Sequence, residues 1–395
     1  MPSIFLSSDT SVTATAAALK LPKPEVRVEF RPASDYDGDH GFDWVRRGDT
    51  SLLGDKDYAD IIGSCTGGSF VADIDEKQLK KYYKEYCDSN SAVPKIMEED
   101  YPVAVLALFK DKKAKVSLKV NIKKSPDELK FKYNEQALEL TKNKLDNVSV
   151  GEQDLKDFLS ISFKDGRASS QIEFVEVYAD DELAGQLRVL PNDTKHTYLV
   201  DVVFIYVKTD IGNGSIKEGK HMANEVDSFN KTFRQSLSDP QVTKVNWDLR
   251  KNEKFNTDLV LDDDGNKIIK KGDELFNFLE SEFSKEHSQY DDNYKVFIFD
   301  DRGGRKKADG SIKGLGGAMQ IGGKIGFVFS SRKLTTLPHE FLHGLGLRHT
   351  FDCAEKYQFE KLKTANIMDY TQNRQYTWHW QWKKLWPKFK KISEV

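Results

Sequence analysis

The chain has 395 residues, more than one compact domain usually holds, and a formal net charge of −3. Basic and acidic residues are nearly balanced, which argues against nucleic acid as the main partner, because phosphate binding requires a basic surface. No apolar run approaches the length of a membrane span. We therefore expect roughly two or three globular domains and no membrane span.

Residues 1–20 are small and polar, and we expect a flexible tail. They lack a basic leader before an apolar core, so they do not resemble a secretory signal. The cysteines Cys65, Cys87 and Cys353 are too few and too widely spaced for a disulfide framework, although one bridge between Cys65 and Cys87 stays open. This small number of cysteines is consistent with folding in a reducing, cytosolic compartment.

We assign residues 21–95 to an N-terminal module of unknown function. Residues 26–30 alternate as a strand should. The acidic loop at residues 35–44 could hold Ca²⁺, but it lacks the ligand spacing of a calcium motif. Calcium is thus an unsupported alternative, and we expect a surface loop that Phe42 and Trp44 anchor by packing.

Strand-like runs dominate residues 96–195. An apolar run at residues 101–109 and an alternating run at 114–122 predict a hairpin. Further runs follow at residues 159–163, 172–178 and 187–190. This spacing predicts a β-sandwich that resembles an immunoglobulin-like module. Such modules often present a catalytic domain, although the fold alone gives no function.

The pattern changes after a linker at residues 191–194, and residues 196–395 are expected to form an α/β domain. Long apolar runs predict buried strands, and runs with apolar residues on one helical face predict helices. The predicted elements are strands at residues 198–207, 242–247, 294–299 and 324–330, helices at 218–237 and 273–283, and a hairpin at 258–269. A C-terminal helix with a stripe of tryptophans is expected to pack on the lower half of this domain.

One stretch carries a chemical pattern: His339, Glu340, His343, Gly346 and His349 stand at the spacing H-E-x-x-H-x-x-G-x-x-H. On a helix the first two histidines lie one turn apart on one face and can bind one zinc ion. The glutamate can take a proton from a water at the metal. The glycine permits the turn that brings back the third histidine. Three protein ligands leave one position open, which is typical of catalytic zinc.

This motif resembles that of the metzincin zinc endopeptidases, whose second signature is a methionine turn downstream. Residues 366–370 read Asn-Ile-Met-Asp-Tyr. The resemblance implies that Met368 forms an apolar floor beneath the imidazoles without binding the metal. It also implies that Tyr370 lies beside the metal, where it could steady the oxyanion or serve as a structural hydrogen bonder.

The closer resemblance is to the pappalysin and cytophagalysin group. Residues 346–351 read Gly-Leu-Arg-His-Thr-Phe and residues 366–371 read Asn-Ile-Met-Asp-Tyr-Thr, as is common in that group. There a cysteine soon after the third histidine is usually bonded to one near the methionine turn. Here Cys353 is present, but no cysteine follows it. The resemblance covers roughly the last two hundred residues only.

Residues 303–323 are rich in glycine. A nucleotide-binding loop is the alternative, but its full pattern is missing. In metzincins an edge strand lies here and pairs with the substrate backbone, and glycine would permit that close approach. The resemblance places this strand at residues 317–320, with Gly317, Ala318 and Met319 beside the substrate.

The sequence thus predicts an α+β multidomain protein: N-terminal β-rich, immunoglobulin-like modules, then a metzincin-type α/β zinc-protease domain. In the expected mechanism Glu340 is the general base for peptide hydrolysis at the zinc, with Tyr370 as a candidate helper. The expected partner is a protein or peptide substrate, and the protein is expected to be secreted without an evident signal, with a cytoplasmic location as the alternative. A rival hypothesis is a toxin, effector or binding adaptor whose N-terminal half directs delivery to a surface or partner.

Overall fold

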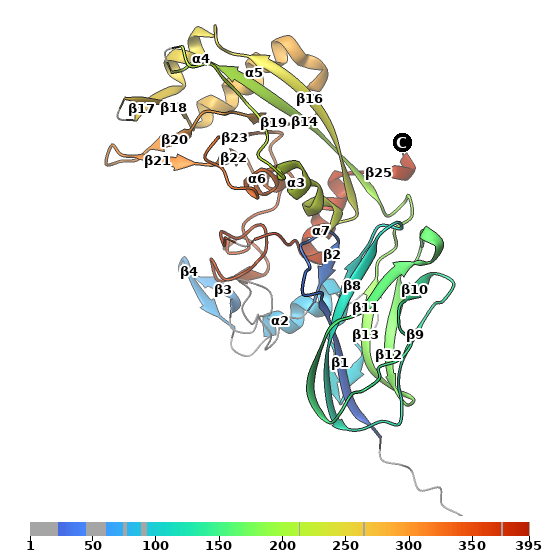
Figure 1. Ribbon diagram of the computed structural model, residues 1–395. Coiled ribbons are helices and arrows are strands. Elements are labelled where there is room, and N and C mark those ends of the chain that lie inside the picture. Colours follow the sequence, from blue (N-terminus) through green and yellow to red (C-terminus); the bar gives the residue numbers. More distant parts are fainter. Residues whose placement is uncertain are drawn as a thin grey trace, which may run out of the picture.

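The computed structural model describes residues 23–44, 61–73, 77–87, 93–212, 214–263, 265–372 and 374–394. The tail predicted at residues 1–20 lies outside this part of the chain. The protein is a mixed α+β structure, mostly β-strands with few helices, in which a β-sandwich lies beside a body built on a seven-stranded sheet (Figure 1). No helix in the described ranges is long and apolar enough to cross a membrane.

The sandwich consists of two sheets around a shared core, with strand orders β1-β8-β11-β10 and β2-β7-β13-β12-β9. Buried residues alternate with lysines along β8, so one face of the strand meets the core and the other meets water. The strands are β1 Glu25–Pro32, β2 Gly41–Asp43, β7 Ala104–Ala107, β8 Lys113–Lys124, β9 Leu129–Tyr133, β10 Leu138–Leu140, β11 Gly151–Phe163, β12 Glu173–Ala179 and β13 Glu182–Val189. A short hairpin of β5 Lys95–Ile96 and β6 Glu99–Asp100 precedes β7.

The hairpin predicted between residues 101–109 and 114–122 is wrong. Strand β7 pairs with β2 and β13 in one sheet, whereas β8 pairs with β1 and β11 in the other. The short connection between them crosses the sandwich instead of turning back within one sheet. Alternation along a strand shows which face is buried but not which strand lies beside it, so the sequence could not distinguish the two connections.

Residues 21–95, predicted as a separate module, are divided between the two halves of the protein. Strands β1 and β2 belong to the sandwich, and Phe42 and Trp44 pack in its core as expected. The hairpin of β3 Ile62–Thr66 and β4 Ser69–Ala72 instead pairs with β24 Gln358–Phe359. In Figure 1 this hairpin lies beside the loops that follow helix α6. Helix α2 Lys77–Tyr82 follows it in sequence.

The body is organised around four parallel strands in the order β16-β14-β19-β23. Strand β22 continues the sheet antiparallel to β23, and β15 and β25 add short antiparallel pairings to β14. All four strands predicted for this region are present. Their bounds are β14 Tyr198–Thr209, β15 Lys217–Glu218, β16 Ser238–Asp248, β19 Tyr294–Ile298, β22 Gly317–Met319, β23 Ile325–Val328 and β25 Lys390–Lys391.

Helices cover both faces of this sheet because the side chains of its strands alternate between two cores. Phe204 of β14 packs in the cluster that contains α3 Glu225–Arg234 and α6 Thr336–Gly344. Ile205 packs in the opposite cluster with α5 Asp273–His287. Helix α3 begins later than the predicted start at residue 218, because Glu218 belongs to β15 and residues 219–224 form the connection to the helix.

A smaller sheet extends from the α5 side, with the order β17-β18-β20-β21. It contains the hairpin predicted at residues 258–269. Helix α4 Glu253–Asp258 precedes it. The strands are β17 Val260–Asp263, β18 Asn266–Lys270, β20 Gly303–Lys306 and β21 Ile312–Leu315. Strand β21 leads through one residue into β22, so the two sheets meet at the edge of the main sheet.

The C-terminal helix α7 His379–Leu385 lies at the junction of the two halves. Trp378 and Trp382 are buried in one cluster with Tyr82 and with Leu190, which follows the sandwich strand β13. The prediction that the tryptophan stripe packs on the lower half of one domain was therefore too narrow. The tryptophans form part of a buried cluster that is shared by the sandwich and the body.

A disulfide joins Cys65 of β3 to Cys353, four residues after His349 in sequence. The alternative bridge from Cys65 to Cys87 is therefore wrong. Pairing of β3 with β24 brings Cys65 beside the loop that follows the third histidine. The N-terminal hairpin is thus covalently tied to the segment between the histidines and the methionine turn.

We expect Cys65→Ser to lower the free energy of unfolding by about 2–5 kcal/mol, because the bond closes a loop of 288 residues in the unfolded chain. Cys353→Ser should cost the same, and the double variant no more than either single one. Equilibrium unfolding in guanidinium measures all three. If the double variant lost the sum of the two single losses in unfolding free energy, the result would contradict a disulfide between Cys65 and Cys353.

Candidate metal centre

Helix α6 carries the first part of the histidine motif and is held by packing. Leu337, Phe341 and Leu342 are buried, and Phe341 makes edge contacts with Phe229 and Phe233 of α3. No side-chain cap holds the start of this helix. The residue before the helix, Thr335, makes no capping bond, and the Thr336 hydroxyl instead accepts from the Lys333 amide in the preceding turn. Core burial therefore positions the helix.

The structure brings the three predicted ligands together. His339 and His343 are buried one turn apart, and Gly346, at φ +94°, turns the chain so that His349 returns to them. One nitrogen from each imidazole lies within 4.8 Å of the other two. Among the described residues this is the group of His, Cys, Asp or Glu side chains that could hold a metal ion.

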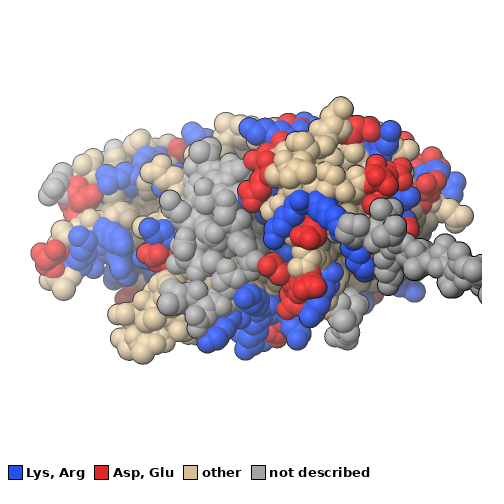
Figure 2. Space-filling view, turned by 90° about the horizontal axis from the view of Figure 1, so that it is seen from below, with Lys and Arg blue, Asp and Glu red and all other residues tan. Residues whose placement is uncertain are grey.

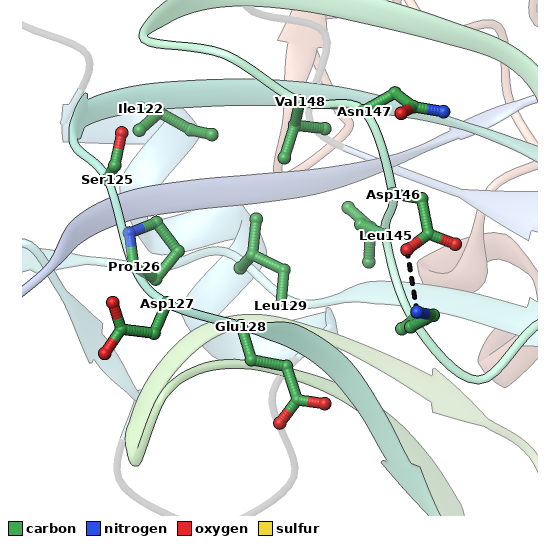
Figure 3. A pocket seen from close by; sticks show the side chains of 11 residues that line it. Ile122, Ser125, Pro126, Asp127, Glu128, Leu129, Leu145, Asp146, Asn147 and Val148 are labelled. Atoms are coloured by element: carbon green, nitrogen blue, oxygen red, sulfur yellow. Dashed lines mark ion pairs between the residues drawn. The ribbon is translucent and has the colours of Figure 1, made fainter.

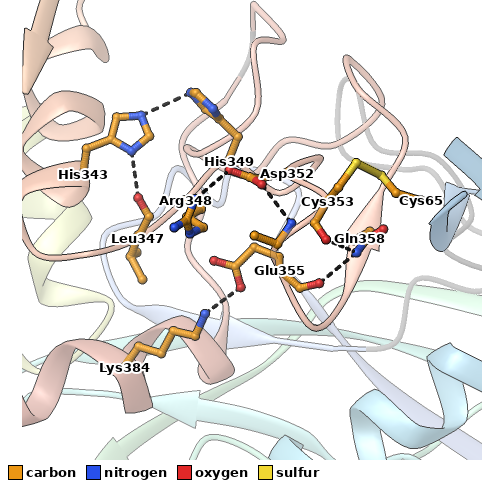
Figure 4. A network of polar contacts seen from close by, with 11 residues as sticks. Cys65, His343, Leu347, Arg348, His349, Asp352, Cys353, Glu355, Gln358 and Lys384 are labelled. Carbon is orange, nitrogen blue, oxygen red and sulfur yellow. Dashed lines mark hydrogen bonds and ion pairs between the residues drawn. A yellow bond between two sulfur atoms is a disulfide. The ribbon is translucent and has the colours of Figure 1, made fainter. Parts of the chain in front are cut away.

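Backbone carbonyls fix the orientation of two rings. The Nδ1 atom of His339 donates to the Ile367 carbonyl at 2.7 Å, and that of His343 donates to the Leu347 carbonyl at 2.7 Å. Figure 4 shows the second bond together with the approach of His349. With Nδ1 protonated, each Nε2 carries the lone pair that a metal ion requires.

The spacing of these nitrogens fits a tetrahedral cation. The Nε2 atoms of His343 and His349 lie 3.1 Å apart. Two nitrogens bound to one tetrahedral zinc lie about 3.3 Å apart, given Zn–N bonds of about 2.0–2.1 Å. In the absence of a metal, one of these two nitrogens donates a hydrogen bond to the other. The donor set and its geometry therefore suit zinc.

Burial keeps these imidazoles neutral. It lowers the pKa of His339 well below its usual value, and the Arg374 guanidinium lowers it further. Burial also lowers the pKa of His343, and burial together with His343 lowers that of His349 to about 4. A neutral imidazole is the form that binds a metal ion.

Glu340 follows His339 and reaches the cleft beside strand β22. A Cβ atom added at Gly317 would lie 3.3 Å from the Cγ of Glu340, so the edge strand and the carboxylate are neighbours. Loss of water around the carboxyl raises the pKa of Glu340 to about 7, although Arg374 opposes this shift. A carboxyl with a pKa near neutrality can both accept and release a proton.

Met368 is fully buried in the cluster that contains the α6 side chains Phe341 and Leu342. Its turn is held by Asn366, which exchanges two side-chain hydrogen bonds with Gln381 of α7 at 2.8 and 3.1 Å. This burial agrees with an apolar packing role. The floor beneath the imidazoles remains a prediction.

Tyr370 lies against the histidines. Its ring centroid is 4.7 Å from that of His349 and 5.8 Å from that of His339, and the residue is 43% exposed. Partial burial, and then the Glu340 carboxylate, raise the pKa of Tyr370, so its hydroxyl keeps its proton. A partly exposed phenol beside the three histidines can donate a hydrogen bond into the cleft.

Arg374 is a site residue that the sequence reasoning missed. Its guanidinium is buried, donates to the Asp369 carbonyl at 2.7 Å and to the Thr335 hydroxyl at 3.1 Å, and lies 5.9 Å from the Tyr370 ring centroid. It thus ties the methionine turn to the start of α6. No spacing rule links Arg374 to the histidines, so only its three-dimensional contacts reveal it.

These groups line one cleft of about 600 Å³, together with β22 and Leu315 of β21. The edge strand predicted at residues 317–320 is present as β22, with Gly317, Ala318 and Met319 paired to β23 on one side. All three residues line the cleft, although Met319 is largely buried. The pairing of this strand with a substrate remains a prediction.

A second cavity, of about 480 Å³, lies in the sandwich between the β8–β9 connection and residues 144–148 (Figure 3). Its Lys144 and Asp146 form an ion pair at 3.1 Å. None of the predicted site residues lines it. The loop weighed for calcium also shows no converging ligands, because Asp35 pairs with Lys115 and Asp37 with Lys231.

We expect Arg374→Ala to lower the free energy of unfolding by about 1–3 kcal/mol, because buried hydrogen-bond partners would lose their donor. Arg348→Ala is the matched control. Arg348 is a more exposed arginine whose ion pair with Asp352 should contribute less than about 1 kcal/mol. Thermal and guanidinium unfolding measure both variants. Equal losses would contradict the structural role of Arg374.

No protein-family model and no curated protein matches the chain.

Proposed function

We propose that the protein is a zinc-dependent endopeptidase of the metzincin type. One observation carries the proposal: three neutral imidazoles and the Glu340 carboxyl converge in a cleft that a sheet edge borders. A structural zinc site is normally closed by four protein ligands. Here three imidazoles meet beside a cleft large enough for a peptide segment, which is the arrangement of a catalytic site.

Strand β22 supplies the means to bind a peptide backbone. It ends the sheet order, so among the described strands it pairs with β23 alone. An extended peptide can add to such an edge through main-chain hydrogen bonds. A Cβ at Gly317 would come within 2.7 Å of the Phe327 carbonyl, so a side chain there would displace the strand. Glycine thus keeps the edge close to Glu340.

In the proposed reaction, His339, His343 and His349 would hold a zinc ion, which would supply the positive charge that lowers the pKa of a water and polarises the scissile carbonyl. Glu340 accepts the proton of the attacking water and then donates it to the leaving amine as the C–N bond breaks. The Tyr370 hydroxyl donates a hydrogen bond to the oxyanion. The carbonyls of Ile367 and Leu347 hold two imidazoles in place throughout.

The resemblance to metzincins supports this proposal at the level of architecture. The parallel strands β14, β16 and β19 are followed in the chain by the antiparallel edge strand β22, the parallel strand β23 and the helix that bears the first two histidines. The Cys65–Cys353 bridge supports action in an oxidising compartment, where disulfides persist. Ala365 and Tyr376 of the body pack in the core of the sandwich. The sandwich therefore supports the body structurally, a role that does not require the delivery hypothesis.

We expect purified full-length protein to contain about one zinc per chain and to cleave unfolded casein until a chelator is added. Glu340→Gln should retain zinc and lose about 10²–10⁴-fold in kcat, because the proton acceptor is gone. Metal analysis and a fluorescent casein assay measure both quantities.

The matched control is Glu280→Gln, an exposed glutamate on α5, across the sheet from the centre. It should cleave like the unchanged protein. Wild-type cleavage by the Glu340 variant, or folded protein that binds no zinc, would overturn the proposed function.

A further inference from the structure

Besides Arg374, four cationic side chains from separate segments line the same cleft as the metal centre. Lys271 precedes α5, Arg305 lies in β20, Lys313 in β21, and Lys333 precedes α6. We call these four residues the basic rim. Figure 2 shows Lys and Arg side chains, with some Asp and Glu beside them, at the left end of the molecule, the end that the β20–β21 hairpin occupies in Figure 1. The rim forms only when the fold brings these segments together.

The positive charge of the rim is not neutralised within the described structure. Arg305 and Lys313 are direct cross-strand partners, and like charges at such positions are destabilising. None of the four forms an ion pair with a described residue. Of the described residues that line the cleft, only Glu340 is acidic, and the proposed reaction already uses it.

Lysines elsewhere in the chain are often paired. Lys115 contacts Asp35, Lys231 contacts Asp37, and Lys384 contacts Glu355, each within 3.0 Å. The chain as a whole carries a net charge of −3. An uncompensated positive cluster in a net acidic protein is therefore a local feature of this cleft.

The position of the rim indicates a peptide ligand. Strand β21 leads through Gly316 into β22, so a polypeptide that pairs with β22 and continues along the cleft passes Arg305 and Lys313. Carboxylates of that polypeptide would meet the unpaired cations. Single-stranded nucleic acid is disfavoured, because Tyr370 is the one Phe, Tyr or Trp among the described residues that line the cleft, and base binding needs stacking platforms.

We propose that the cleft selects polypeptide substrates that carry an acidic segment beside the scissile bond, and that the basic rim binds this segment. The inference rests on the proposed endopeptidase function and names its substrate class. Because the rim is exposed, its attraction is screened by salt. Preference for acidic substrates should therefore be strongest at low ionic strength.

Binding is tested on the full-length, zinc-loaded Glu340→Gln variant, which separates recognition from cleavage. Two fluorescent peptides of equal length are compared, one with a run of Glu and one with Gln at the same positions. We expect the Glu peptide to bind about tenfold more tightly at low salt, and the double substitution of Arg305→Gln and Lys313→Gln to remove most of this preference. Fluorescence anisotropy measures the dissociation constants.

Lys306→Gln is the matched control, because Lys306 neighbours Arg305 in the same hairpin, pairs with Ile312, and does not line the cleft. It should keep the full preference. Peptides that carry the Glu run on one side or the other of the scissile bond are compared, and the tighter-binding peptide identifies the side that contacts the basic rim. Equal binding of the Glu and Gln peptides on both sides would overturn the inference, as would tighter binding of a single-stranded oligonucleotide of equal charge.

Cleavage by the unmutated enzyme separates the two proposals. Equal kcat/KM for both peptides, with chelator-sensitive cleavage, would overturn the acidic preference and leave the endopeptidase in place. Tight binding of the Glu peptide without cleavage of any peptide would overturn the endopeptidase and leave a peptide-binding cleft. Preferential, chelator-sensitive cleavage of the Glu peptide would support both.

Discussion

The two bonds from imidazole Nδ1 atoms to backbone carbonyls are the constraint on which the centre depends. The carbonyl partners, Leu347 and Ile367, lie outside α6, one in the turn after the helix and one in the methionine turn. A metal ligand must be aimed to within a fraction of an ångström, and a helix alone places only the Cα atoms. The ring orientation therefore depends on segments that are themselves held by distant parts of the chain.

Those segments are held from several directions. Asp369 accepts hydrogen bonds from the amides of Leu362, Lys363 and Thr364, which closes the loop before the methionine turn. Asn366 is bonded to Gln381 of α7. The first residue of helix α7 is bonded to the sandwich, because the Asp43 carboxylate accepts a hydrogen bond from the His379 amide. The same carboxylate accepts a hydrogen bond from the Tyr82 hydroxyl. A chain of buried contacts thus leads from the imidazoles to the sandwich core.

Electrostatics divides the cleft into an inner and an outer part. In the inner part, burial keeps the imidazoles neutral and raises the pKa of Glu340, which are the properties that the proposed metal binding and proton transfer require. At the outer edge, Arg305 and Lys313 face each other in register without a described carboxylate partner. Both arrangements cost folding stability, which is common where a protein binds or reacts.

Short-range patterns in the sequence were enough for the helix, the glycine turn and the parallel strands. His339 and His343 meet because the helical repeat places residues four apart on one face, and Gly346 can adopt a backbone that other residues resist. The parallel strands could be predicted because a strand that is buried on both faces requires a continuous apolar run. The tertiary structure decided the partner of Cys65, the crossing from β7 to β8, the place of α7, and the presence of Arg374 and the basic rim. Each of these depends on contacts between residues far apart in the chain, and such contacts leave no periodic signal in a single sequence.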